Sequence, residues 1–154
     1  MGYYRFVVFT CFLAFTVIVL GAYTRLTDAG LGCPDWPGCY GQLTVPATPD
    51  QVTDTAYLEQ RPLEPDKGWK EMVHRYFAGT LGLAILFITV WSWRRRRDDP
   101  GQPVWLPTFL LALVIFQAAL GMWTVTLLLK PVIVMGHLLG GFATFSLLVL
   151  LALR

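Results

Sequence analysis

Apolar residues are grouped into long uninterrupted stretches separated by polar segments. The four longest stretches cover residues 4–23, 69–93, 104–129 and 132–153. Because a bilayer core about 30 Å thick is crossed by roughly 20 apolar residues in a helix, each stretch predicts one membrane-spanning α-helix. The second stretch differs from the others, because it begins with Lys70, Glu71, His74 and Arg75 before it turns apolar.

The segments between these stretches predict the architecture. Residues 24–68 hold six of the ten prolines and are rich in acidic side chains, so they form a long outer loop, within which residues 50–60 predict a short surface helix capped by Asp50. The other two connections are short. The fold class is therefore all-α: a polytopic membrane protein in which residues 1–154 form a single four-helix transmembrane bundle, with the second and fourth helices diagonally opposite.

Composition and charge agree with a membrane protein and predict its orientation. The chain is 55% hydrophobic with a net charge of +2, and its mean hydropathy is +0.54. Lys and Arg concentrate on the cytoplasmic side, so the run Arg94 to Arg97 predicts a cytoplasmic N-terminus and places residues 24–68 outside. The first stretch exceeds a signal-peptide core and lacks a small-residue cleavage site, and no transit peptide precedes it. We therefore expect a bacterial plasma (inner) membrane, with lipid and not nucleic acid as a partner.

Both histidines of the chain fall inside predicted spans, where an ionisable side chain is by default a functional candidate. His74 lies about five residues into the second helix and His137 about six into the fourth, so at about 1.5 Å per residue their depths agree within roughly 2 Å. Two imidazoles at one depth on diagonal helices suit the axial positions of a haem iron. The alternatives are hydrogen-bonded packing histidines, or an axial sulfur from Met72, Met122 or Met135.

Glycines near both histidines would leave room for a flat macrocycle. The glycines in question are Gly79, Gly82, Gly136, Gly140 and Gly141. The alternative interpretation is a helix–helix contact, because small residues four apart commonly let two membrane helices approach each other.

Charged residues cluster at the outer boundary of the predicted bundle. Glu71 precedes His74 by three residues, so the two share one helix face, and the carboxylate either acts on the ligand of His74 or stabilises the first helical turn. Arg25 and Arg75 are candidates to pair with haem propionates, whereas Lys130 is expected to extend to the interface.

Two of the three cysteines lie close together in the outer loop. Cys33 and Cys39 fall in the stretch GLGCPDWPGCYG, on the side where a disulfide persists. Their spacing does not match the C-x-x-C of thiol oxidoreductases, so a structural bridge and a redox role both stay open. Cys11, inside the first helix, is interpreted as a small apolar side chain.

Stretches from all four helices and the outer loop resemble the haem A synthase family. They are GAYTRLTDAGLGCPDWPGC, EMVHR with AGTLG, QAALGMWTV, and GHLLGG. The resemblance implies that His74 and His137 are the axial ligands of the N-terminal haem site and that Glu71 is the carboxylate of an E-x-x-H motif. It also implies a pairing of Cys33 with Cys39. Helix-three residues beside the site would be Gln117, Gly121 and Thr124.

The family also implies a reaction, cofactors and partners. Its members are oxidoreductases that convert haem O to haem A by oxidising the C8 methyl group to formyl, and they hold a haem b in a second four-helix half. This chain matches only the first half, so it is a fragment or a half-length member that forms a homo-oligomer. Implied partners are haem O, haem O synthase, an electron-transfer partner and a second half. Two other classes are a bis-histidine cytochrome b module and a quinone-coupled thiol oxidase; the missing C-x-x-C pairs count against the second.

Overall fold

A computed structural model describes residues 2–154, and within them the secondary structure is helical with no strand. The helices are α1 (Tyr3–Leu26), the short 3-10 helix η1 (Pro49–Gln51), α2 (Ala56–Gln60), α3 (Pro65–Arg95), α4 (Trp105–Thr126) and α5 (Pro131–Ala152). Four of them, α1, α3, α4 and α5, are long and apolar enough to cross a membrane. The prediction of an all-α polytopic membrane protein is confirmed.

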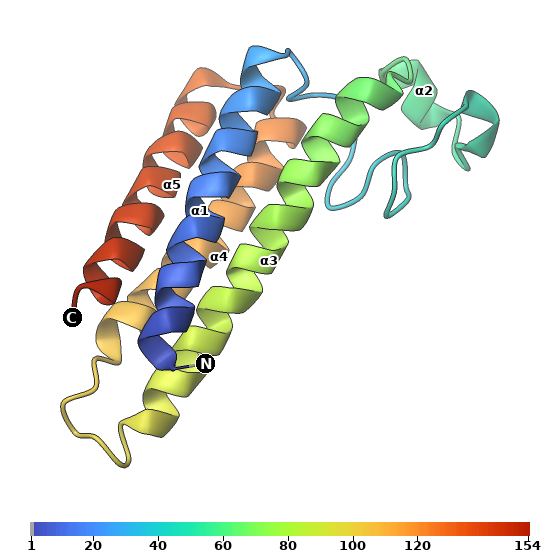
Figure 1. Cartoon of the computed structure of the whole chain (residues 1–154). Coiled ribbons are helices and arrows are strands. Elements are labelled where there is room, and N and C mark those ends of the chain that lie inside the picture. The colour runs from blue at the N-terminus through green and yellow to red at the C-terminus, as the bar shows by residue number, and fades with distance from the viewer. Residues whose placement is uncertain (1) are drawn as a thin grey trace.

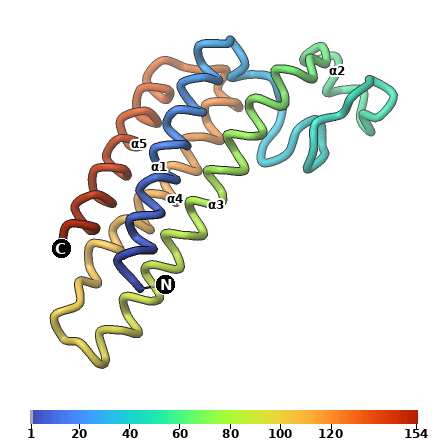
Figure 2. The backbone as a smooth tube through the Cα atoms, in the orientation of Figure 1, coloured from blue at the N-terminus to red at the C-terminus, as the bar shows by residue number. Residues whose placement is uncertain are grey.

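The four long helices lie side by side and alternate in direction (Figure 1). Both chain termini and the α3–α4 connection lie at one end, called here the terminal end, whereas residues 27–64 and the α4–α5 turn lie at the other, the loop end (Figure 2). Helices α1 and α4 each pack against both α3 and α5. Helices α3 and α5 therefore occupy opposite corners of the bundle, as predicted.

The observed bounds correct two sequence predictions. Helix α3 begins at Pro65 rather than residue 69, because a proline at the first helical position needs no hydrogen-bonded amide. The helix expected over residues 50–60 is wrong: η1 and α2 are separate, and Asp50 caps neither. The break falls at Val52, whose backbone is extended and whose side chain is buried against the outer loop's own apolar cluster.

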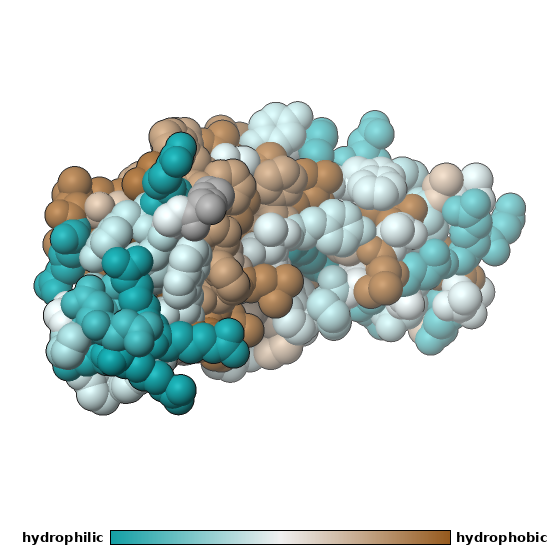
Figure 3. Space-filling view, turned by 60° about the horizontal axis from the view of Figure 1, so that its bottom comes forward, coloured by the Kyte–Doolittle hydropathy of each residue, from teal (hydrophilic) through white to brown (hydrophobic). Residues whose placement is uncertain are grey.

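Apolar packing is concentrated near the terminal end of the bundle. Its buried cluster draws on all four long helices, and its members are Tyr3, Val7, Ala14, Leu81, Ile85, Ile88, Leu110, Leu148 and Leu151. Figure 3 shows hydrophobic side chains around the middle of the helices and hydrophilic ones gathered at the two ends. Neither histidine belongs to this cluster. The histidines lie in the other half of the bundle, toward the loop end.

The outer loop has a small core of its own, which rests on α3. The cluster consists of Cys33, Cys39, Tyr40, Val45, Val52 and Met72. Burial raises the pKa of the Tyr40 hydroxyl, which donates a 2.9 Å hydrogen bond to the carbonyl of Pro62. The Asp35 carboxylate accepts from the amides of Tyr40 and Gly41, at 2.6 and 2.9 Å. These hydrogen bonds fix the conformation of the loop itself, and Met72 of α3 packs into the loop's core.

Candidate functional site

His74 of α3 and His137 of α5 face each other across the bundle diagonal. Their ring centroids are 6.5 Å apart and the ring planes are inclined by 88°. The Nδ1 atom of each ring is buried and has no hydrogen-bond partner among residues 2–154. An unpaired buried polar atom costs about 1–3 kcal/mol. A backbone carbonyl lies beside each ring, that of Val17 beside His74 and that of Gln117 beside His137, so the case for a ligand site rests on the two imidazoles facing each other inside the bundle.

The donor set fits a haem iron. Within residues 2–154 no three His, Cys, Asp or Glu side chains are grouped so that they could hold a metal ion. A haem needs only one protein donor on each face, because the macrocycle supplies the remaining nitrogens. Two imidazoles at bonds of about 2 Å from one iron have ring centres roughly 6 Å apart, close to the observed 6.5 Å. Ligation by His74 and His137 nevertheless stays a prediction.

Glycines on α1 and α4 allow the backbones of these two helices to lie close to the histidine rings. A Cβ added to Gly21 of α1 would lie 2.9 Å from Cε1 of His74, and one added to Gly121 of α4 would lie 3.4 Å from Cε1 of His137. By contrast, a Cβ on Gly79, Gly82 or Gly141 would meet nothing within 4 Å. The sequence analysis missed Gly21, because no spacing relates α1 to the histidines.

Glu71 lies buried between α3 and the outer loop. Its Oε1 forms a 2.5 Å ion pair with Nη2 of Arg75, one turn along α3, and its Oε2 accepts a 3.0 Å hydrogen bond from the backbone amide of Cys33. Since α3 begins at Pro65, Glu71 lies in the second turn. The interpretation of Glu71 as a first-turn carboxylate is therefore wrong, and the carboxylate tethers the loop to the helix.

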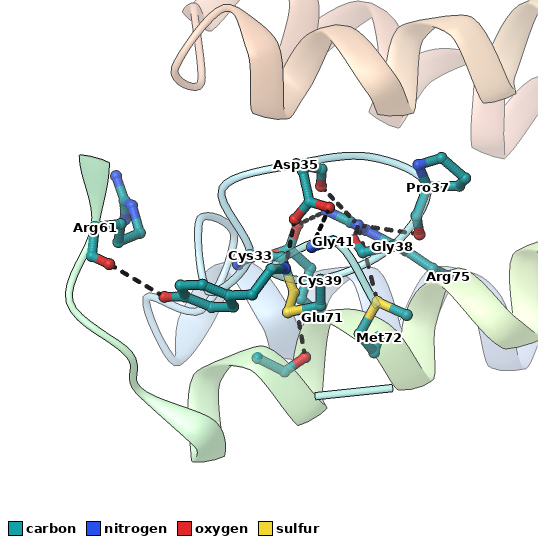
Figure 4. The surroundings of a disulfide bond; sticks show 12 residues. Cys33, Asp35, Pro37, Gly38, Cys39, Gly41, Arg61, Glu71, Met72 and Arg75 are labelled. Carbon is teal, nitrogen blue, oxygen red and sulfur yellow. Dashed lines mark hydrogen bonds and ion pairs between the residues drawn. A yellow bond between two sulfur atoms is a disulfide. The ribbon is translucent and has the colours of Figure 1, made fainter. Parts of the chain in front are cut away.

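The arginines expected to pair with propionates differ in their surroundings. Arg75 Nη1 donates to the backbone carbonyls of Asp35 at 3.0 Å and Gly38 at 2.5 Å (Figure 4). Arg25 is exposed in the last turn of α1 and forms no ion pair within the described part of the chain. Arg75 is thus held by protein groups, whereas Arg25 is directed to the exterior. For both residues the pairing with propionates stays a prediction.

Cys33 and Cys39 are bonded to each other in the structure, with Cα atoms 4.8 Å apart and both residues fully buried. The bridge closes the segment that supplies the Cys33 amide to Glu71 and the Gly38 carbonyl to Arg75. We call these four residues, Cys33, Gly38, Glu71 and Arg75, the loop clamp. No sequence pattern connected the cysteines with Glu71, because the contact spans 38 residues.

Replacing both Cys33 and Cys39 with serine is expected to lower stability while the four helices still form. Opening a loop this short removes about 2 kcal/mol in the chain-entropy treatment, and the loop clamp loosens. Chemical unfolding of the purified double variant measures the loss. The control is Cys11→Ser, a third cysteine that is half-buried in α1 and unbonded. Complete loss of the helical fold would contradict this local role.

Gln117 of α4 is buried, with 8% of its surface exposed, and neither its Oε1 nor its Nε2 has a partner among residues 2–154. It faces Gly140 of α5, where an added Cβ would overlap the amide. Gly140 lies one helical turn from His137. The residues assigned to helix three by resemblance thus lie near the histidine pair, since Gly121 contacts His137 and Thr124 donates to the Gly121 carbonyl.

Comparison with known proteins gives one consistent family. Residues 4–154 match the model of the COX15-CtaA family, described as cytochrome oxidase assembly protein. The chain is 54% identical over 145 residues to a protein from Shewanella oneidensis named heme A synthase, covering 92% of the chain and 43% of that protein. Proteins of the same name from Shouchella clausii and Caulobacter vibrioides are each 30% identical, over 94% and 92% of the chain and 42% and 46% of their own lengths.

The chain therefore spans less than half the length of these relatives. No solved structure matches it.

Proposed function

Because the chain belongs to the COX15-CtaA family of cytochrome oxidase assembly proteins, we propose that it forms the substrate-binding half of a haem A synthase. The observation that carries this proposal is the histidine pair, whose ring centroids lie 6.5 Å apart across the bundle diagonal. His74 and His137 would hold the iron of haem O from its two faces. In that position they also orient the edge of the macrocycle that reacts.

The proposed reaction oxidises the C8 methyl group of haem O to a formyl group. In each of two steps an oxygen from water is added while two electrons and two protons leave, giving first an alcohol and then a hydrate. The hydrate loses water to form the formyl group. An electron acceptor outside this four-helix unit, either a neighbouring haem or a partner protein, takes the electrons.

Glu71 is proposed to accept protons released in these steps. Its carboxylate is one helical turn from His74 and is held in place by Arg75 and the Cys33 amide. These two contacts position the carboxylate, and a general base must be positioned within hydrogen-bond reach of the proton that it accepts. Arg25 and Arg75, at the loop end, are proposed to neutralise the propionates, the only charged substituents of the macrocycle.

We propose that the part of the relatives' sequences that this chain does not match supplies a second haem site. In this proposal a second four-helix half, from the same polypeptide or from a second copy of this chain, holds a haem b that receives electrons. Haem O synthase would deliver the substrate. We also propose that the Arg94 to Arg97 end faces the cytoplasm of a bacterial inner membrane, because basic residues concentrate on that side.

A bis-histidine cytochrome b module, which would only relay electrons, is not favoured. The relatives that match this chain over most of its length are named heme A synthase. The thiol-oxidase alternative would need a second cysteine pair. Beyond Cys33 and Cys39 the chain has only Cys11.

Mass spectrometry of extracted haems tests the proposed function. The complete protein that carries this chain is expressed in a bacterium that makes haem O but no haem A, and haem A is expected only when the protein is present. The matched control is the same protein with His74→Ala and His137→Ala, which should leave haem O unconverted. Unchanged haem O in cells that contain folded wild-type protein would contradict the proposal.

A further inference from the structure

The side-chain amide of Gln117 is unpaired inside the bundle. The residue is 8% exposed, and both its Oε1 and its Nε2 lack a hydrogen-bond partner among residues 2–154. Thr144, one turn beyond the neighbouring Gly140, has its hydroxyl engaged elsewhere, because its Oγ1 donates to the Gly140 carbonyl at 2.8 Å. Native proteins rarely leave a buried amide without partners, and such a group usually marks a missing ligand or water.

The register of α4 and α5 places this amide one turn deeper than His137. Gly121 lies beside the His137 ring, whereas Gln117, one turn earlier on α4, lies beside Gly140, one turn later on α5. Measured from the loop end, Gln117 is nine residues from the end of α4 and His137 six from the start of α5. At about 1.5 Å per residue, the amide lies roughly 4–5 Å deeper than His137.

The depth of the Gln117 amide determines which substituent of a bound haem it can contact. The charged propionates need the wet loop end, where Arg25 and Arg75 lie, since burying an unpaired carboxylate in the apolar interior is very costly. The deeper edge of the macrocycle carries neutral groups. In haem O the one neutral polar substituent is the hydroxyl at the base of its farnesyl chain, and haem B has an apolar vinyl group in its place.

We propose that Gln117 is a specificity-determining residue that hydrogen-bonds the hydroxyl of the hydroxyethylfarnesyl group of haem O. The inference rests on the proposed function, because it takes haem O to be the ligand between His74 and His137. The amide accepts from the hydroxyl through Oε1 or donates to it through Nε2. Haem B offers no partner and leaves the amide unsatisfied, so a site built to bind a hydroxyl discriminates against the ligand that lacks it.

Binding titrations of the full chain, prepared without haem, test this role with haem O and haem B as separate probes. Gln117→Met keeps the side-chain volume and removes the hydrogen bond. It is expected to weaken haem O binding about tenfold, the effect of losing one or two neutral hydrogen bonds, while haem B binding stays within about twofold. The tail of haem O contributes equally in both proteins, so the change in the affinity ratio isolates the contact with Gln117.

Two further variants test whether the change in the ratio of haem O to haem B affinity is specific to the Gln117 amide. Gln117→Asn withdraws the amide by one methylene and should show the same selective loss, which keeps the test usable if the methionine variant folds poorly. Gln102→Met changes another buried glutamine with an unpaired Oε1, at the terminal end of the bundle, and should leave the affinity ratio unchanged.

Three outcomes would overturn the inference. Equal weakening of both haems by Gln117→Met would indicate a structural role or a contact with a propionate, and an unchanged ratio would indicate no contact with the hydroxyl. Wild-type protein that binds neither haem would remove the proposed function together with this inference. Selective loss of haem O affinity, in contrast, supports both.

Discussion

Replacing either His74 or His137 with alanine is expected to abolish the low-spin bis-imidazole spectrum of the haem-loaded, purified chain. The rings lie on opposite corners of the bundle with centroids 6.5 Å apart, so each serves one face of the iron, and a six-coordinate low-spin iron needs both. Each single variant should lose the whole signal rather than half of it. Absorption and electron paramagnetic resonance spectra of the two variants, recorded at equal haem content, measure the loss.

Added imidazole distinguishes a lost ligand from a damaged fold. A small imidazole can enter the space vacated by the alanine substitution and restore the low-spin signal, provided that the surrounding helices remain packed. Leucine variants of Met72, Met122 and Met135 control for an axial sulfur and should keep the wild-type spectrum. A low-spin signal that survives in both histidine variants would show that the ligand assignment is wrong.

Replacing Glu71 with glutamine in the complete protein is expected to stop haem A formation while haem O stays bound. Glutamine keeps the shape and can still accept from the Cys33 amide, but it cannot take a proton. The extracted haem should therefore be haem O or its alcohol, with the ratio of haem A to haem O falling by at least the 100-fold that general-base catalysis typically contributes (about 10²–10⁴). Chromatography of the extracted haems and total haem per protein are measured together.

Arg75→Gln is the matched control for this experiment. Both substitutions break the same buried ion pair, which by itself destabilises a protein by about 3–5 kcal/mol, but only Glu71→Gln removes the proton acceptor. We expect Arg75→Gln to reduce haem A formation, through a looser loop clamp and the loss of one proposed propionate partner, and to retain measurable conversion. Equal and complete loss in both variants would assign Glu71 to holding the loop, and normal conversion in Glu71→Gln would exclude it from the chemistry.

The helices that cross the membrane could be predicted from hydropathy, because an apolar run of sufficient length has no other stable conformation in lipid. The same signal placed the start of α3 too late. Residues 65–68 are polar, so they carry no hydropathy signal although they are helical. Hydropathy reports where a helix lies in lipid, whereas its first turn depends on local backbone chemistry.

The closeness of His74 and His137 was accessible from the sequence, because both lie near the loop-end starts of regular helices. The depth count itself was wrong for His74, which lies nine residues beyond the start of α3 rather than about five, whereas His137 lies six beyond the start of α5. The loop clamp was not accessible. Its contact between Glu71 and Cys33 depends on the path of an irregular loop, and no periodicity specifies such a path. Gly21 was missed for a related reason, since its closeness to His74 depends on how α1 and α3 are rotated against each other.

The diagonal placement of α3 and α5 also sets an order of events during synthesis. Of the four described spans, the second to leave the ribosome carries His74 and the fourth carries His137, with α4 between them. During synthesis, His74 is therefore in the membrane before His137 has been inserted. A tetrapyrrole that is bound by both rings can therefore be captured only after the α4–α5 hairpin has inserted.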